Sequence, residues 1–255
     1  MILDTLSNAL INNTIITAFF FVGLVTAISY WISTNLTNGY IHGSAIAIAL
    51  GLLLAYFGGY LTGGDKGLAD IPLFAGVGIL GGAMFRDFAI VATAFGVDLK
   101  HLKNAGLIGA ISVVFGVALS FFIGAIVAVM FGYNDAISIT TIGAGAATYI
   151  VGPVTGTALS ASTEVIALSV AVGLIKSILV MIVTPFIAPY IKLNNAESAM
   201  IFGGLMGTTS GVAGGLAATD PRLVPYGAMT ATFYTGVGCL LAPSVLFLIV
   251  RALMA

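Results

Sequence analysis

A single lysine, Lys176, stands in the middle of a long apolar stretch of this sequence. Residues 165–175 precede it and residues 177–188 follow it, and neither flank carries a charge. At 1.5 Å of rise per helical residue, each end of the stretch is about 16 Å away, which is far for a lysine side chain to reach water. A charge at the centre of a bilayer costs at least about 2.5–3.5 kcal/mol. Lys176 therefore needs a partner, which is a residue of another element, a water-filled cavity or a carboxylate of a substrate.

Glycine, proline and threonine interrupt the apolar pattern in two places. Residues 143–160 read GAGAATYIVGPVTGTALS, and residues 202–219 read FGGLMGTTSGVAGGLAAT. Glycine is a weak helix former, and proline breaks a helix interior. A helix that breaks inside a bilayer exposes backbone groups that protein, water or a ligand must satisfy. Its free N-terminal amides suit an anion, and its free oxygens suit a hard cation such as sodium.

We therefore expect the two glycine-rich stretches to hold an anion beside a cation. Arg86 joins the candidates because the planar guanidinium pairs well with carboxylates, although a salt bridge between helices explains it equally well. For the small residues, close packing of helices is the alternative explanation. The candidates for substrate binding are Thr141, Gly143, Gly145, Thr148, Gly152, Pro153, Thr155, Gly156, Thr208, Thr209, Ser210, Gly211, Lys176 and Arg86. The candidates for sodium binding are Thr140, Thr148, Thr209 and Ser210.

The residue patterns of common enzymes are missing. The sequence contains no HExxH, no GxSxG and no P-loop ending in Gly-Lys-Ser/Thr. Its two histidines, His42 and His101, and its one cysteine, Cys239, do not form a metal-binding set. We expect no enzymatic activity, and no cofactor other than a coupling ion.

The composition predicts an integral membrane protein. Of the 255 residues 60% are hydrophobic and 7% are charged, whereas soluble domains carry about 25% charged residues. The mean hydropathy is +1.16. The net charge of −1 offers no basic field for nucleic acid, so membrane lipids are the expected surroundings.

The hydrophobic pattern predicts an all-α, multi-pass protein with a single transmembrane domain over residues 1–255. A helical span needs about 20 apolar residues. Eight hydrophobic elements, numbered in chain order, lie near residues 14–33, 41–62, 71–97, 104–131, 137–158, 164–191, 198–218 and 225–251. Elements 5 and 7 are expected to be interrupted or re-entrant, and element 3, which shares their glycine-rich pattern, is a third candidate for such an interruption.

A weak internal repeat relates the two halves of the chain. A shift of 122 residues places Gly81, Gly82 and Asp98 on Gly203, Gly204 and Asp220, which suggests four-element repeats over 14–131 and 137–251. If all eight elements span the membrane, three lysine or arginine residues fall on each side. The positive-inside rule then gives no orientation, unless an element is a hairpin that returns to its own side.

Several stretches of this chain resemble the MadM family, the larger membrane subunit of the bacterial malonate transporter. They include HGSAIAIALGLLLAYFGG, TTIGAGAATYIVGPVTG and NNAESAMIFGGLMGTTSGVAGGLAATDPRLVPYGAMTATF, and the resemblance covers nearly the whole chain. It implies a sodium-coupled importer of malonate in the bacterial cytoplasmic (inner) membrane, acting with the small membrane subunit MadL. A symporter of this kind would work by alternating access. The resemblance supplies no residue-level site, so the candidates above rest on the physical argument.

Residues 137–251 are also similar in motif order to LrgB-type proteins. Where that pattern has Ser-His-Gly, this chain has Thr209, Ser210 and Gly211. This second resemblance implies a different function, a holin-like membrane component or pore that acts with a small partner subunit. A homo-oligomer is compatible with either function.

Overall fold

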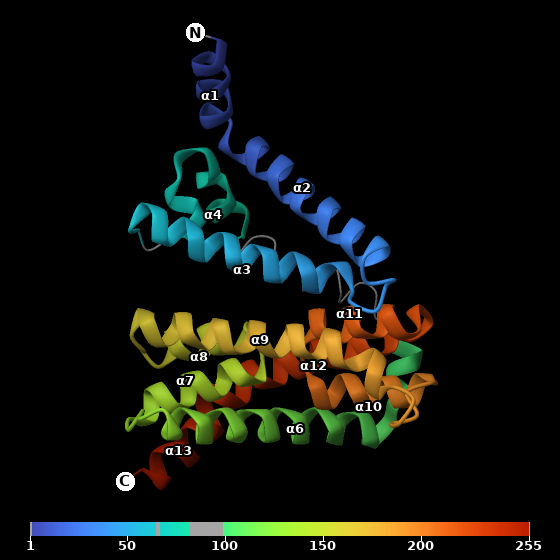
Figure 1. The fold of residues 1–255 in the computed structure, drawn as a ribbon. Helices are drawn as coiled ribbons and strands as arrows, with labels where there is room; N and C mark the ends of the chain where they lie inside the picture. Colours follow the sequence, from blue (N-terminus) through green and yellow to red (C-terminus); the bar gives the residue numbers. More distant parts are fainter. Residues whose placement is uncertain (1, 65–66, 82–98, 255) are drawn as a thin grey trace. The chain divides into compact units, whose positions relative to one another are not determined.

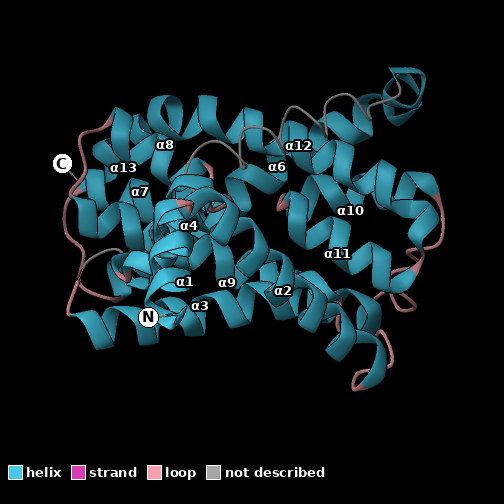
Figure 2. Cartoon of the chain, turned by 90° about the horizontal axis from the view of Figure 1, so that it is seen from above, coloured by secondary structure: helices cyan, strands magenta, loops and turns pink. Residues whose placement is uncertain are grey.

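The structure is a computed structural model that describes residues 2–64, 67–81 and 99–254 (Figure 1). These residues form helices joined by loops, with no strand among them (Figure 2). The all-α prediction is confirmed. Within the described residues, five helical segments are long and apolar enough to cross a membrane, as expected for a multi-pass protein: Thr14–Asn35, Gly43–Thr62, Leu107–Met130, Thr163–Ile187 and Pro221–Leu253.

Contacts divide the chain into two compact units, Met1–Ala92 and Thr93–Ala255. The prediction of one transmembrane domain with repeats over 14–131 and 137–251 stays a prediction, because much of element 3 lies outside the described residues. Arg86 also lies outside them, so its proposed role is not tested.

The first unit contains two long apolar helices that pack against each other. His42 caps the start of the second helix, where its Nδ1 accepts the amide of Ser44 at 3.3 Å. Partial burial lowers the pKa of His42, which favours the neutral ring that this cap requires. Gly63, with a left-handed φ of 65°, ends the same helix. The elements are α1 (Ile2–Asn12), α2 (Thr14–Asn35), α3 (Gly43–Thr62), the short 3-10 turns η1 (Gly67–Asp70) and η2 (Pro72–Phe74), and α4 (Ala75–Gly81).

The second unit combines long helices with short helices that stop halfway. The long ones correspond to predicted elements 4, 6 and 8, and the short ones to elements 5 and 7. The elements are α6 (Leu99–Met130), α7 (Ala136–Ala147), α8 (Val151–Ala158), α9 (Thr163–Ile187), α10 (Ala196–Met206), α11 (Thr209–Thr219), the 3-10 turn η3 (Pro221–Leu223), α12 (Val224–Leu241), the π-helical segment η4 (Ala242–Leu246) and α13 (Phe247–Leu253).

Predicted element 5 is a helical hairpin, which we call the first hairpin (α7 and α8, residues 136–158). A Cβ atom on Gly152 would lie 2.9 Å from Gly145 Cα, and one on Gly156 would lie 2.8 Å from Thr141 Cγ2. These two contacts show that α8 runs back along α7. The turn at residues 148–150 is the first tip.

Predicted element 7 also folds back on itself, as the second hairpin (α10 and α11, residues 196–219). The first arm runs alongside the start of α12, where Thr230 donates to the carbonyl of Met200 at 2.8 Å. The second arm runs alongside the last part of α9, with Gly215 against Thr184. The chain reverses at Gly207 and Thr208, the second tip, and Gly207 has a left-handed φ of 72°.

The two hairpins enter the second unit from opposite ends, so that their tips point towards each other (Figure 1). One end holds the loops 131–135 and 159–162, and we call it the first-hairpin end. The other holds the loop 188–195 and residue 220, and we call it the second-hairpin end. Helices α9 and α12 cross between these ends in opposite directions. This inverted arrangement is typical of secondary transporters.

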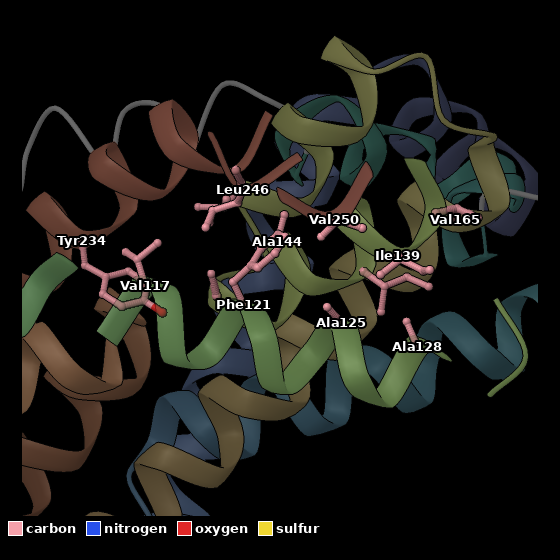
Figure 3. Packing of buried hydrophobic residues seen from close by; sticks show 14 of the residues in the cluster. Val117, Phe121, Ala125, Ala128, Ile139, Ala144, Val165, Tyr234, Leu246 and Val250 are labelled. Atoms are coloured by element: carbon pink, nitrogen blue, oxygen red, sulfur yellow. The ribbon is translucent and has the colours of Figure 1, made fainter. Parts of the chain in front are cut away.

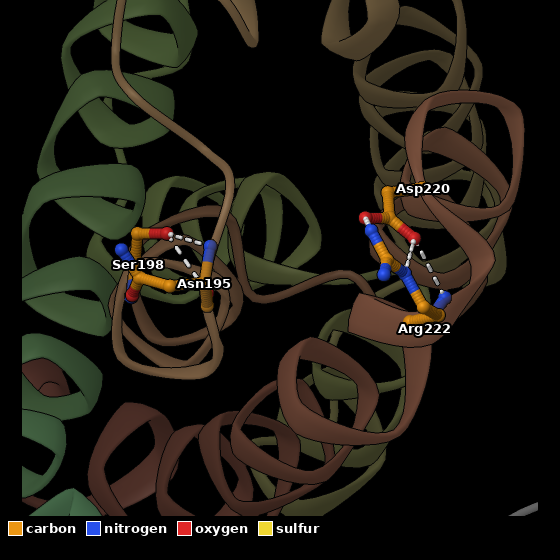
Figure 4. Close-up of polar contacts among 4 residues, drawn as sticks. All are labelled: Asn195, Ser198, Asp220 and Arg222. Atoms are coloured by element: carbon orange, nitrogen blue, oxygen red, sulfur yellow. Dashed lines mark hydrogen bonds and ion pairs between the residues drawn. The ribbon is translucent and has the colours of Figure 1, made fainter.

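The two hairpins begin with the same capping pattern at an offset of 60 residues. Asp135 accepts the amide of Ser138 at 2.8 Å. Asn195 accepts the amide of Ser198 at 2.9 Å in a full capping box (Figure 4). Although burial raises the pKa of the Asp135 carboxyl, hydrogen bonds from Ser138 outweigh it and hold the pKa below its usual range. The two hairpins thus begin with the same local structure.

An ion pair between nearby residues follows the second hairpin. Asp220 accepts Nη2 of Arg222 at 2.8 Å and Nε at 3.0 Å, and it also caps η3 (Figure 4). Hydrogen bonds from Arg222 hold the pKa of the Asp220 carboxyl below its usual range.

Buried apolar side chains join the first hairpin to its neighbours. Ala144 and Ile139 on α7 belong to one buried cluster with Leu246 of η4 and Val250 of α13 (Figure 3). Phe121 of α6 is fully buried in the same cluster. The first hairpin is thus enclosed by α6, α9 and the α12–α13 region.

Candidate functional site

The ammonium group of Lys176 contacts three parts of the second unit. It donates to Ser120 Oγ on α6 at 2.9 Å and to the carbonyl of Ala147 at 2.9 Å. It also donates to Tyr234 Oη on α12 at 3.4 Å and lies 5.3 Å from the centroid of the Tyr234 ring. Ala147 is the last residue of α7, so the ammonium sits at the negative end of that helix. An element other than α9 supplies every one of these partners.

Ser177, the next residue on α9, contacts the other tip. Its hydroxyl is hydrogen-bonded to the hydroxyl of Thr208, and both residues are fully buried. Neighbouring residues near the middle of α9 therefore touch both hairpins, Lys176 at the first tip and Ser177 at the second. We call the region around these contacts the tip site.

The ring of Tyr234 closes the tip site on the α12 side. It is fully buried and lies against Gly207, where any Cβ atom would collide with the ring. Its hydroxyl donates to the carbonyl of Gly116 on α6 at 3.1 Å. Tyr234 thus fixes the second tip, α6 and the ammonium of Lys176 relative to one another.

The two tips differ in how their amides are used. At the first tip, Thr148 Oγ1 accepts the amides of Ile150 and Val151, at 3.1 Å and 3.2 Å. At the second tip, Thr208 Oγ1 accepts the amide of Gly211 at 3.4 Å. The amides of the first residues of α11 have no acceptor within the helix.

The hydroxyl of Ser210 adds a free donor at the start of α11. Its Oγ is buried and has no hydrogen-bond partner among the described residues. The N-terminal end of a helix is also its positive end. The second tip therefore offers hydrogen-bond donors to an anion. At the first tip, Thr148 already accepts the amides that an anion would bind.

When protonated, Lys176 places a positive charge inside the membrane-spanning part of the unit. In the described residues the partners of Lys176 are neutral oxygens, and no ion pair involves it. A fixed ammonium in surroundings of low dielectric attracts an anion strongly. The chemistry of the site suits a carboxylate.

All five glycines among the candidates lie at close contacts between helices. Side-chain or backbone atoms of neighbouring helices lie where a Cβ atom would be on Gly143, Gly145, Gly152, Gly156 and Gly211. This matches the alternative that small residues let membrane helices approach. A direct contact of these glycines with a substrate is not tested.

The hydroxyl candidates fall into three groups. Thr148 and Thr208 cap the tips, and Thr209 and Ser210 start α11, so all four lie at the tips. Thr141 donates to the carbonyl of its own helix at Ile137, at 2.8 Å. Thr140 and Thr155 are fully buried, and their hydroxyls have no partner among the described residues. Pro153 is half-buried in the first turn of α8.

Three residues of the tip site are not among the predicted residues for substrate or sodium binding: Ser120, Ser177 and Tyr234. Each is a polar residue within an apolar helix, and Ser177 directly follows Lys176. That pattern was a usable signal for Ser177. Ser120 and Tyr234 lie 56 and 58 residues from Lys176, so only folding brings them to the ammonium.

Comparison with known proteins agrees with the transporter-like arrangement. Neither the curated proteins nor the solved structures gave a match. The model of the malonate/sodium symporter MadM subunit family matches residues 6–254, which is nearly the whole chain. With two opposed hairpins around the buried Lys176 and a family match of this length, the chain belongs to the malonate/sodium symporter MadM subunit family.

Proposed function

We propose that this chain forms the transport pathway of a malonate importer and binds malonate at the tip site. The observation behind this proposal is the position of Lys176, whose ammonium contacts neutral oxygens at the first tip, on α6 and on Tyr234. Malonate carries two carboxylates on one carbon atom, and both are ionised near pH 7. A site for it needs two clusters of donors close together. The tip site has one at Lys176 and one at the start of α11.

The donors suggest how malonate would bind. One carboxylate accepts from the hydroxyl of Ser210 and the free amides of α11. The other accepts from Lys176 and displaces one of its present oxygen partners, because an ammonium has three donors and all three are taken. Displacement of the Ala147 carbonyl would release the first tip from α9. Substrate binding would then change the contacts that hold the first hairpin in place.

Sodium coupling and alternating access complete the proposal. The chain has no nucleotide-binding motif, so an ion gradient drives import. The inverted hairpins move relative to the rest of the unit and open the tip site to each side in turn. The protein has no enzymatic activity and uses sodium as its coupling ion. It works in the bacterial cytoplasmic membrane with a small second subunit, MadL.

The hairpins also give the second unit an orientation. Because each hairpin returns to its own side, Lys192 and Arg222 lie at the same end. Lys100 and Lys103, at the start of α6, lie there as well, whereas Arg251 lies at the opposite end. Four of the five lysines and arginines of this unit other than Lys176 are therefore at the second-hairpin end. By the positive-inside rule, this end faces the cytoplasm.

Cysteine labelling tests this orientation. In a Cys239→Ala background and right-side-out vesicles, we expect a membrane-impermeant maleimide to label Asn134→Cys but not Tyr190→Cys. Both residues are exposed, Tyr190 to 87%, so a difference in labelling reports the side rather than burial. Permeabilised vesicles should label both variants equally. The reverse pattern in sealed vesicles would contradict the orientation.

Reconstitution tests the function itself. In liposomes that contain the chain with its partner subunit, we expect an inward sodium gradient to drive uptake of radiolabelled malonate. Ser210→Ala should raise the malonate concentration for half-maximal uptake about 10-fold, since a hydrogen bond to a charged group contributes about 1.5–3 kcal/mol. Thr26→Ala is the control, because Thr26 belongs to the first unit, is exposed and donates to the carbonyl of Val22 in its own helix. An equal rate of malonate uptake with and without the sodium gradient would exclude symport.

A further inference from the structure

Two fully buried threonine hydroxyls on the first hairpin have no hydrogen-bond partner among the described residues. They belong to Thr140 on α7 and Thr155 on α8, and both residues are 0% exposed. A threonine within a helix commonly donates to the carbonyl four residues earlier, as the neighbouring Thr141 does to Ile137. A buried hydroxyl without a partner is costly and indicates an ion or water beside it.

The two hydroxyls lie at the same level of the hairpin. Gly156 on α8 lies beside Thr141 on α7. Thr155 directly precedes Gly156, and Thr140 directly precedes Thr141. Because the arms are antiparallel, one step back in each arm turns both side chains to the same side of the hairpin. Thr140 and Thr155 are therefore neighbours on one face.

That face is directed towards α12 and the π-helical segment η4. Thr155 is one helical turn after Val151, and a Cβ atom on Gly238 of α12 would lie 2.9 Å from Val151 Cγ2. Thr140 is one turn before Ala144, which belongs to the same buried cluster as Leu246 of η4 (Figure 3). Single-turn π-helical segments within α-helices are frequent at functional sites.

We propose that Thr140 and Thr155 ligate a sodium ion between the first hairpin and η4. Hydroxyl oxygens suit a hard cation, and carbonyl and water oxygens complete its shell. Thr155 lies in the last turns of α8, whose C-terminal end is negative. This inference rests on the proposed function, from which it takes sodium as the coupling ion.

The proposed ion site is separate from the tip site and is particular to the first hairpin. Thr140 is seven residues before Ala147, which corresponds to about 10 Å along α7. At the offset of 60 residues, the second hairpin has Met200 and Gly215 in place of Thr140 and Thr155. The first hairpin would thus bind the cation, and the second hairpin the anion. The acidic residues Asp135 and Glu164 lie at the first-hairpin end, where they favour a cation's approach.

Thermal unfolding of the purified full chain in detergent tests the proposal without transport. We expect NaCl to raise the unfolding temperature of the unaltered chain above its value in choline chloride of the same ionic strength. Thr140→Val and Thr155→Val should each need at least a tenfold higher NaCl concentration for the half-maximal rise. Without sodium both variants should be at least as stable as the unaltered chain, because they remove a buried hydroxyl that lacks a partner. Thr140→Ser keeps the hydroxyl and should retain the response.

Thr184→Val is the matched control. Thr184 is 1% exposed, but its hydroxyl bonds to the carbonyl of Val180 in its own helix. This variant should keep the sodium response of the unaltered chain. If the unaltered chain shows no response specific to sodium, or if the Thr140→Val and Thr155→Val variants respond as it does, the ion site is wrong. Sodium-driven malonate uptake by the unaltered chain would still support the proposed function in either case.

Discussion

Lys176→Gln is expected to weaken malonate binding about 10- to 100-fold and to reduce sodium-driven uptake accordingly. The substitution removes the positive charge from the tip site, and a hydrogen bond to a charged group contributes about 1.5–3 kcal/mol. Glutamine can still donate to the carbonyl of Ala147, so the first tip keeps a partner. The loss should therefore appear in binding and transport more than in folding. Binding is measured by calorimetry in detergent, and uptake in liposomes.

Lys192→Gln is the control for this prediction. It makes the same chemical change at an exposed position in the loop 188–195, away from the tip site. Its malonate binding should match that of the unaltered chain. If Lys176→Gln binds malonate within twofold of the unaltered chain, then Lys176 has a structural role only, and the proposed substrate site is wrong.

Gly207→Ala is expected to distort the second tip and to destabilise the second unit. Gly207 has a left-handed φ of 72°, which costs an alanine about 1–2 kcal/mol. The new methyl group would also collide with the buried ring of Tyr234, and overpacking of this kind costs about 1–3 kcal/mol. Together these effects should lower the unfolding temperature in detergent by about 10 °C. Displacement of Tyr234 would also disturb Lys176, so transport should fall in the protein that remains folded.

Gly236→Ala provides the matched comparison on the same helix as Tyr234. Gly236 is exposed on α12, and no atom lies within 4 Å of the position of a Cβ. Alanine is favoured over glycine within a helix by about 1 kcal/mol, so this variant should be as stable as the unaltered chain or slightly more stable. Equal unfolding temperatures for the two alanine variants would show that the second tip does not require glycine.

The local chemistry of the tips could be predicted from the sequence because it depends on short-range effects. Gly152 and Pro153 weaken a helix wherever they stand, and Lys176 is costly in any apolar environment. The breaks themselves occur at residues 148–150 and 207–208, inside the two stretches that the sequence indicated. What the sequence left open was whether a broken element continues across or turns back.

The sequence by itself determined the helical membrane class, the two weak elements and the buried lysine, since composition and apolar periodicity are properties of neighbouring residues. The tertiary structure alone decided that both weak elements are hairpins with opposed tips, and this changed the charge balance that sets the orientation. It also decided that Ser120 and Tyr234 surround Lys176, and that the hydroxyls of Thr140 and Thr155 share one face. These relations depend on how helices pack across the unit, and no pattern along a single chain segment records that packing.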